Sequence, residues 1–464
     1  MIGGGSAGLS VAAGAVQMGA RVVLLERGPM GGDCLNFGCV PSKSLLAAAH
    51  AAAAVRQAPR FGIRAGEPVV DFAAVRDHVK SVIAAIAPHD SQERFEGLGV
   101  RVIRESGRFT GPRTVAAGEF EIEARRIVIA TGSSPVVPPI PGLDRAPFFT
   151  NETIFDNAAP IPRLLVIGGG PIGLEMAQAY ARLGAKVTVI EGLRALNNDD
   201  PELARIVKQR LGEDGVEIHE GAMVKRIDGS AGKIAIEAEK EGKPVRFEGS
   251  HLLVAVGRRP NLEGLDLEKA GVEAGRGGIR VDARLRTTNR KVFAIGDAAE
   301  GYKFTHIAGY HAGIVIRNAL FRLPAKVDYR ALPWVTYTAP ELAQVGLTEQ
   351  AAREAYGDIA VLRASFAEND RARAEGGTQG LLKVMTTRKG VVVGASMVGD
   401  KAGEVIQGWC LPIARKMKVR DVAGLILPYP TLGEINKRAA GSFYTPSLFS
   451  DRTRRIVRFL LSFG

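Results

Sequence analysis

Residues 163–191 read RLLVIGGGPIGLEMAQAYARLGAKVTVIE, and this stretch decides the fold. An apolar run leads into Gly168-x-Gly170-x-x-Gly173, an Ala-rich segment follows, and a second apolar run closes on Glu191. Glycines at this spacing between a strand and a helix, with an acid about 20 residues further on, are typical of a dinucleotide-binding βαβ unit. The turn presents free backbone N–H groups and the positive end of a helix to phosphate. The stretch therefore predicts a dinucleotide-binding module.

The same pattern opens the chain. Residues 1–27 read MIGGGSAGLSVAAGAVQMGARVVLLER, with Gly3, Gly5 and Gly8 at the same spacing and Glu26 closing the second apolar run. The carboxylate of such an acid accepts hydrogen bonds from ribose hydroxyls. Both copies keep the same order of strand, glycine turn, helix and acid. This shared order favours two dinucleotide-binding modules over two unrelated glycine turns.

Further matching strings show how the two modules are connected. RRIVIATGSSP (125–135) and SHLLVAVGRRP (250–260) share an apolar run, Ala-x-Gly, and a proline three residues later. RKVFAIGDAAE (290–300) is another apolar run, and it ends in Gly296-Asp297, where Asp297 suits a ribityl or phosphate-linked hydroxyl. This order predicts that the second module is inserted within the first.

A cysteine pair follows the first module. The segment GGDCLNFGCVPSK (31–43) contains Cys34 and Cys39, and Cys410 is the only other cysteine of the chain. Buried thiols, a metal clip, a stapling disulfide and a redox disulfide all fit two close cysteines. Buried thiols are plausible because free cysteine is often buried. A structural zinc site would need a second pair of ligands. A chain of this size has enough core to be stable without a structural disulfide. Five helical residues rise about 7.5 Å, whereas disulfide Cα atoms lie within about 6.8 Å, so a bond here needs a distorted helix entrance and is reducible. The spacing favours the redox pair and leaves the alternatives open, while Cys410, in an apolar helical context, is expected in the core.

Two dinucleotide modules beside a cysteine pair suggest an electron relay. A nicotinamide gives two electrons as hydride, and a flavin can pass them on to sulfur. The expected cofactors are therefore FAD and NAD(P)H. Glu191 favours NADH, because its carboxylate accepts from a ribose 2′-hydroxyl and repels a 2′-phosphate, although Arg194 lies nearby.

Composition limits the class of protein. A length of 464 residues suggests several domains, and 46% hydrophobic with 24% charged residues are globular values. No apolar run reaches the length of about 18 residues that a membrane span needs. The 61 basic and 49 acidic residues give a net charge of +12, but they are interspersed, which argues against nucleic-acid binding. Scarce cysteine suits a reducing cytosol, so we expect a cytoplasmic protein.

The two ends of the chain carry weaker signals. Residues 451–464, DRTRRIVRFLLSFG, set four arginines around apolar residues and predict a basic amphipathic helix. We expect this tail to pack on its own protein rather than on a membrane surface. Only Met1 and Ile2 precede the first glycines, so we expect the natural chain to start slightly upstream, and no secretory or transit pattern is visible.

These motifs together resemble the class I pyridine nucleotide–disulfide oxidoreductases, a family that includes dihydrolipoamide dehydrogenase, glutathione reductase and mercuric reductase. The similarity covers nearly the whole chain through GGDCLNFGCVPSK, ATGSSP, GGGPIGLE, GRRPN, AIGDAAE and PWVTYTAPELAQVGLTE. It implies an α/β fold with two Rossmann-like domains, for FAD and NAD(P), and a C-terminal α+β dimerisation domain in a homodimer. The expected boundaries are 1–150 and 278–330 for the FAD domain, 151–277 for the NAD(P) domain, 331–450 for the dimerisation domain and 451–464 for the tail.

The resemblance also implies roles for single residues. Cys39 resembles the thiolate that faces the flavin, and Cys34 the exposed thiol that meets substrate. Lys43 and Glu175 resemble the ion pair near flavin N5, where a cation stabilises reduced, anionic states. The implied cofactor contacts are Gly3, Gly5, Ser6, Ala7, Gly8, Glu26, Arg27, Gly32, Asp33, Lys43, Gly107, Ala130, Thr131, Gly132, Gly296, Asp297, Thr305 and His306 for FAD, and Gly168, Gly170, Pro171, Ile172, Gly173, Glu191 and Gly257 for NAD(P).

One motif departs from the family pattern. Disulfide reductases of the family carry His-Pro-Thr-x-x-Glu, which the partner subunit supplies to the active site. Here the segment is LILPYPTLGE (425–434), with Tyr429 at the histidine position and Glu434 retained. A tyrosine with a pKa near 10 is no ready base at neutral pH. Mercuric reductases resemble this pattern, although they also carry a cysteine pair near the C-terminus that this chain lacks.

The sequence therefore predicts an FAD-dependent NAD(P)H oxidoreductase of mercuric-reductase-like type, with no metal cofactor. Its acceptor is expected to be Hg(II) or another soft metal ion, a disulfide or a quinone. Dihydrolipoamide dehydrogenase is the alternative enzyme. A flavoprotein redox sensor or scaffold without turnover is the alternative of another class.

Overall fold

The computed structural model describes residues 1–463, and the chain divides into two compact units. Unit 1 contains residues 1–192 and 219–327, and unit 2 contains residues 193–218 together with the chain from residue 328 onward. Residues 193–218 thus group with the C-terminal part of the chain. The domain boundaries expected from the sequence remain a prediction.

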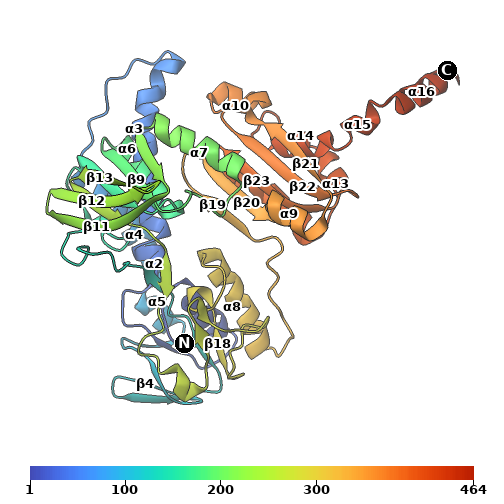
Figure 1. The fold of residues 1–464 in the computed structure, drawn as a ribbon. Helices are drawn as coiled ribbons and strands as arrows, with labels where there is room; N and C mark the ends of the chain where they lie inside the picture. The colour runs from blue at the N-terminus through green and yellow to red at the C-terminus, as the bar shows by residue number, and fades with distance from the viewer. Residues whose placement is uncertain (464) are drawn as a thin grey trace. The chain divides into compact units, whose positions relative to one another are not determined.

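Unit 1 contains two parallel sheets, one for each glycine module (Figure 1). In the first sheet β1 pairs with β2 and β6 pairs with β18, and Ile2 bridges Leu25 and Ile129 between the two pairs. In the second sheet β8 lies between β9 and β14. Strands covered on both faces read as continuous apolar runs, which is why these segments carry no polar alternation.

The helices and strands of unit 1 have well-defined bounds. The first module and its return contain α1 (Ser6–Gln17), β1 (Val23–Leu25), α2 (Gly32–Asn36), α3 (Cys39–Gln57), α4 (Phe72–Ile86), α5 (Gln92–Gly97), β2 (Arg101–Ile103), β3 (Arg108–Gly111), β4 (Thr114–Ala117), β5 (Phe120–Glu123), β6 (Ile127–Ile129), β7 (Ser133–Pro135), β16 (Ala274–Gly275), β17 (Gly278–Ile279), β18 (Val292–Ala294) and α8 (Thr305–Ala319). The second module contains β8 (Arg163–Ile167), α6 (Pro171–Arg182), β9 (Lys186–Glu191), β11 (Ala222–Ser230), β12 (Lys233–Lys240), β13 (Lys243–Gly249), β14 (His251–Val254) and β15 (Arg258–Pro260), and β10 (Val216–Glu220) crosses the boundary between the units.

Unit 2 is built on a five-stranded antiparallel sheet in the order β19-β20-β23-β22-β21. Every residue of β23 (Val392–Gly399) is buried, so this central strand is covered on both faces. Trp409 and Phe366 are among the largest buried side chains of the core beside it, and Cys410 packs against that core as expected. The other elements are α7 (Pro201–Glu213), β19 (Pro333–Thr336), β20 (Glu341–Gly346), α9 (Glu349–Tyr356), β21 (Ile359–Ser365), α10 (Asp370–Glu375), β22 (Leu381–Thr387), α11 (Ala402–Val405), α12 (Cys410–Ala414), α13 (Val419–Ala423), α14 (Glu434–Ser442), α15 (Thr445–Leu448) and α16 (Asp451–Leu460).

A buried lysine fixes α7 to the sheet of unit 2. Lys383 of β22 is only 4% exposed, and its ammonium lies 2.6 Å from Asp200 and 2.6 Å from Glu349. Asp200 also caps the start of α7 by accepting from the backbone N–H of Glu202. Removing one partner from a buried ion pair leaves an uncompensated charge, which is strongly destabilising. These contacts therefore hold α7 in one position on the sheet.

The C-terminal tail does not fold as expected. It forms the predicted helix, α16, but none of the side chains of α16 is buried (Figure 1, dark red). The expectation that the tail packs on its own chain is therefore wrong for the described residues. Helical periodicity predicts that a helix has an apolar face, but it does not predict which surface covers that face. The sequence alone therefore could not show whether the tail packs on the rest of the chain.

Candidate active site

The two glycine modules of unit 1 have matching geometry. A Cβ atom on Gly8 would lie 1.9 Å from the carbonyl oxygen of Gly3, and one on Gly173 would lie 2.0 Å from that of Gly168. Only glycine therefore lets each helix approach its own turn this closely. Glu26 accepts from the N–H of Gly4 at 2.5 Å, and Glu191 accepts from that of Gly169 at 2.7 Å.

The residues expected to contact cofactors lie at the carboxyl ends of the parallel strands or on the helices that follow them. Those of the first module are Gly3 and Gly5 before α1, Ser6, Ala7 and Gly8 in α1, Glu26 and Arg27 after β1, Gly32 and Asp33 in α2, Lys43 in α3, Gly107 before β3, Ala130, Thr131 and Gly132 after β6, Gly296 and Asp297 after β18, and Thr305 and His306 in α8. Those of the second are Gly168 and Gly170 before α6, Pro171, Ile172 and Gly173 in α6, Glu191 in β9 and Gly257 after β14.

A cavity of about 320 Å³ opens beside the first module. Residues that line it include Gly3, Glu26, Arg27, Gly107 and Thr131, all of which the sequence singled out. The adenosine half of a dinucleotide needs backbone N–H groups at a helix start, a carboxylate and a neighbouring cavity, and this region provides all three. The residues present therefore fit FAD.

The cysteine segment is tied to the first phosphate loop, because Gly5 and Gly31 form a β-bridge. Cys34 lies within α2 and Cys39 opens α3, and in this structure both are free thiols. The Sγ of Cys39 lies 3.3 Å from the hydroxyl of Thr305. In this chain Cys39 is exposed and Cys34 half-buried. The roles that the resemblance implies, Cys39 toward the flavin and Cys34 toward the substrate, remain a prediction.

The two thiols differ in acidity. The hydrogen bond from Cys34 lowers the pKa of Cys39 to about 6, helped by the Thr305 hydroxyl and the Lys43 charge and opposed by burial and by Asp33. The same hydrogen bond, together with burial, raises the pKa of Cys34. The directions of these shifts favour the thiolate on Cys39 and the shared proton on Cys34.

An ion pair links α3 to α6. The ammonium of Lys43 lies 2.9 Å from a carboxylate oxygen of Glu175, whose side chain is 6% exposed. Lys43 stands one helical turn beyond Cys39, so a fixed positive charge accompanies the thiolate. The structure thus brings together the four residues Cys34, Cys39, Lys43 and Glu175, which the sequence assigned to one site.

A polar chain that the sequence reasoning missed runs beside the cysteines. The guanidinium of Arg258 lies 2.8 Å from Asp33 and donates to the Ser133 hydroxyl at 2.9 Å. That hydroxyl donates in turn to Asp297 at 2.6 Å, and burial raises the pKa of Asp297. Arg258 belongs to the GRRPN string, so its motif was a signal, but only the preceding Gly257 was selected.

The start of α8 supports the same region. His306 stacks on Phe304 with ring centroids 5.2 Å apart, and the N–H of Gly296 donates to the buried Nδ1 of His311 at 3.2 Å. Burial lowers the pKa of His311 to about 4, so that ring stays neutral and accepts the hydrogen bond. These histidines position backbone and rings, and their contacts give no sign of acid–base work.

Tyr429 belongs to a separate site in unit 2. Its side chain is 70% exposed, and its hydroxyl donates to a carboxylate oxygen of Asp370 at 3.0 Å. This hydrogen bond raises the pKa of Tyr429. Glu434 accepts from the N–H of Thr431 at 3.3 Å, and a cavity of about 260 Å³ adjoins these residues. Sequence reasoning missed Asp370, because no local pattern links it to a tyrosine 59 positions away.

Across residues 1–463, no group of three or more His, Cys, Asp or Glu side chains gathers as it would around a metal ion. No helix in the same range is long and apolar enough to cross a membrane.

Known proteins similar to this chain place it in a family. The model of the pyridine nucleotide–disulphide oxidoreductases matches residues 1–312, and the model of their dimerisation domain matches residues 332–440. This chain belongs to that family. Its members bind FAD and use pyridine nucleotides, and the match to the dimerisation domain indicates a homodimer.

Similar members have different names. The chain is 34% identical to a mercuric reductase of Bacillus cereus (96% of this chain, 71% of the relative) and 36% identical to a mercuric reductase of Streptomyces lividans (96% and 95%). It is 35% identical to a dihydrolipoyl dehydrogenase of Geobacillus stearothermophilus (95% and 94%). Among solved structures, the Cu(II) complex of the HOCl-induced flavoprotein disulfide reductase RclA from Escherichia coli superposes with a TM-score of 0.85 at 29% identity, covering 94% and 98%. LpdA from Mycobacterium tuberculosis gives 0.86 at 26% identity, covering 95% and 98%.

Proposed function

We propose that this chain uses NAD(P)H to reduce a soft metal ion, Hg(II) foremost, through the Cys34–Cys39 pair. The observation that carries the proposal is the setting of the pair, with the Sγ of Cys39 3.3 Å from the Thr305 hydroxyl and one helical turn from Lys43. Cys39 has a lowered pKa beside the Lys43–Glu175 ion pair, and Cys34 keeps its proton. Thiolates are the ligands that soft metal ions prefer.

The proposed cofactors are FAD on the first glycine module and NADH on the second. Bound FAD supplies two-electron chemistry between a nicotinamide hydride and sulfur. Glu191 lies at the end of β9, where its carboxylate suits a ribose 2′-hydroxyl and disfavours a 2′-phosphate. Lys43, Glu175 and Thr305 orient and charge the thiolate, and Asp297 suits a ribityl hydroxyl.

The proposed reaction balances as Hg(II) plus NADH giving Hg(0), NAD⁺ and one proton. The Cys39 thiolate binds the metal without losing a proton, and Cys34 releases its proton as its sulfur becomes the second ligand. Metal binding to a thiol displaces its proton, so this step needs no protein base. A half-buried Cys34 and an exposed Cys39 leave one sulfur accessible to an incoming ion.

The phenol at position 429 argues against dithiol and disulfide substrates. A dithiol must lose protons as it is oxidised, and a positioned base is typically worth ~10²–10⁴-fold in rate. Tyr429 donates a hydrogen bond to Asp370 and its pKa is raised, so the phenol keeps its own proton at neutral pH and takes up no other. Cu(II), whose reduced form Cu(I) is a soft ion that thiolates bind, is a second acceptor on the same route, since a similar flavoprotein was solved as a Cu(II) complex.

Two alternatives have specific support. A dihydrolipoyl dehydrogenase is 35% identical over 95% of this chain, so dithiol oxidation is the runner-up. A flavoprotein sensor or scaffold without turnover is the alternative that Tyr429 motivates. Steady NADH consumption with any acceptor excludes it.

The test is an acceptor panel with the purified protein. NADH oxidation is followed with Hg(II), Cu(II), oxidised glutathione and a quinone, and NAD⁺ reduction with dihydrolipoamide. We expect Hg(II) turnover to exceed dihydrolipoamide turnover. Tyr429→His should raise dihydrolipoamide turnover at least tenfold and leave Hg(II) turnover unchanged, because Glu434 can orient an imidazole.

A matched control is Tyr356→His, which makes the same exchange at another exposed tyrosine. It should change neither activity. Dihydrolipoamide turnover that already exceeds Hg(II) turnover in the unmodified protein contradicts the metal proposal and favours the runner-up.

A further inference from the structure

The C-terminal helix α16 has an apolar face that no part of the described chain covers. Ser450 caps the helix by accepting from the N–H of Thr453, so α16 has a proper helix start. Yet Ile456, Val457 and Leu460 are 49%, 47% and 59% exposed. Monomeric proteins rarely leave so many neighbouring apolar side chains in water without a partner.

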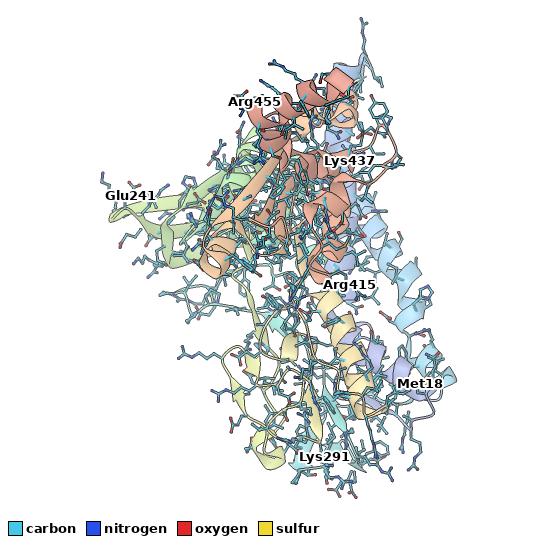
Figure 2. All side chains as sticks on the ribbon, turned by 90° about the vertical axis from the view of Figure 1, so that its right-hand side faces the viewer. Met18, Glu241, Lys291, Arg415, Lys437 and Arg455 are labelled. Carbon is cyan, nitrogen blue, oxygen red and sulfur yellow. The ribbon has the colours of Figure 1, made fainter. Side chains whose placement is uncertain are left out.

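Charge and apolar surface lie on opposite sides of this helix. At 100° per residue, Arg454, Arg455 and Arg458 fall within one third of the helical circumference. Ile456, Val457 and Leu460 fall on the opposite third. Figure 2 shows Arg455 on this helix, and all three arginines are exposed. A cationic face opposed to an apolar face is the pattern of helices that lie in a membrane interface.

We propose that α16 docks this enzyme on an anionic membrane surface. Residues 441–463 contain four arginines and one acid, Asp451, so the segment attracts phosphate headgroups. Its ten residues span about 15 Å, too short to cross a bilayer core of about 30 Å, so the helix lies in the plane of the surface. Leu448 and Phe449, exposed just before it, extend the apolar contact.

A second copy of α16 is a poorer occupant of this face. A two-fold pairing would bring the same patch of each subunit together. Such a pairing would cover the apolar faces but leave both arginine faces without an anionic partner, since each helix carries a single acid, Asp451.

Vesicle sedimentation tests the proposal with the full-length protein. The probes are vesicles of phosphatidylcholine alone and vesicles with 30% phosphatidylglycerol, each at low and high salt. We expect binding only to the anionic vesicles, with loss at high salt. Each arginine near an anionic surface contributes about fivefold to the binding constant, so Arg454→Gln, Arg455→Gln and Arg458→Gln together should weaken binding about a hundredfold.

Three further variants distinguish the causes. Lysine at the same three positions keeps the charge and should keep binding. Serine at positions 456, 457 and 460 keeps the charge and should abolish binding. Glutamine in place of Arg205, Arg276 and Arg290, which are exposed arginines elsewhere, changes the net charge equally and should leave binding intact.

NADH oxidation with an artificial acceptor checks that each variant is folded. Binding by the chain truncated after Ser450, or equal loss in the Arg205, Arg276 and Arg290 variant, would overturn the proposal. Dimer dissociation on truncation, seen by analytical ultracentrifugation, would overturn it too, because the face would then belong to the subunit interface.

Discussion

The hydrogen bond between the two thiols makes the sharpest prediction. It is the largest cause of the lowered pKa of Cys39, which falls from an ordinary 9.0 to about 6. Cys34→Ala removes the donor, whereas Cys34→Ser keeps a hydroxyl donor at the same place. We therefore expect the pKa of Cys39 to rise by about two units in the alanine variant and to stay within about one unit in the serine variant.

The assay is alkylation of Cys39 by iodoacetamide between pH 4 and pH 10, with peptides identified by mass spectrometry. The midpoint of the pH profile must be measured rather than the rate at one pH. A two-unit rise lowers the thiolate fraction at pH 7 about tenfold, but the more basic thiolate is intrinsically about eightfold more reactive. Cys410 is the internal comparison, because burial raises its pKa.

Equal midpoints in the alanine and serine variants would refute this reasoning. They would mean that Lys43 and Thr305, rather than the Cys34 thiol, set the acidity of Cys39. A midpoint near 6 that maps to Cys34 in the reduced, unmodified protein would reverse the roles of the two thiols.

Three other predictions follow from single contacts. Gly8→Ala should yield protein with little bound FAD, measured by flavin absorbance, because its Cβ would meet the Gly3 carbonyl. Glu191→Ala should reduce the preference for NADH over NADPH at least tenfold in kcat/KM, and an unmodified protein that prefers NADPH would contradict the assignment of Glu191. Lys383→Met should lower the free energy of unfolding by about 3–5 kcal/mol in a denaturant titration, because Asp200 and Glu349 would keep unpaired charges; a loss below 1 kcal/mol would show that the cluster contributes little.

Features that depend on local spacing could be predicted from the sequence. The turn, the helix and the closing acid of each module lie within 29 consecutive residues, and the structure gives Glu26 and Glu191 equivalent backbone contacts. The cysteine pair and Lys43 also share one short segment. Cys39 and Lys43 lie one turn apart on the same helix, α3, so the helix fixes their distance before any tertiary contact forms.

Features that depend on contacts between distant parts of the chain could not be predicted from the sequence. Arg258 meets Asp33, and Lys383 meets Asp200, across long stretches of chain whose approach is decided by packing. The pairing of Tyr429 with Asp370 is of the same kind, because an isolated tyrosine gives no sign of which carboxylate it will contact.

Under the proposed function, the proton on Cys34 is the one that distinguishes a metal substrate from a dithiol substrate. Cys39 is already a thiolate above about pH 6, whereas the pKa of Cys34 is raised, so oxidation of the pair must remove that second proton. The Tyr429 phenol is neutral and donates a hydrogen bond to Asp370, so it is a poor acceptor for the Cys34 proton. A soft metal ion removes the proton by binding the sulfur itself, whereas a dithiol substrate brings protons of its own. We therefore expect the tyrosine at position 429 to slow a dithiol dehydrogenase more than a metal reductase, and the acceptor panel with Tyr429→His tests this expectation.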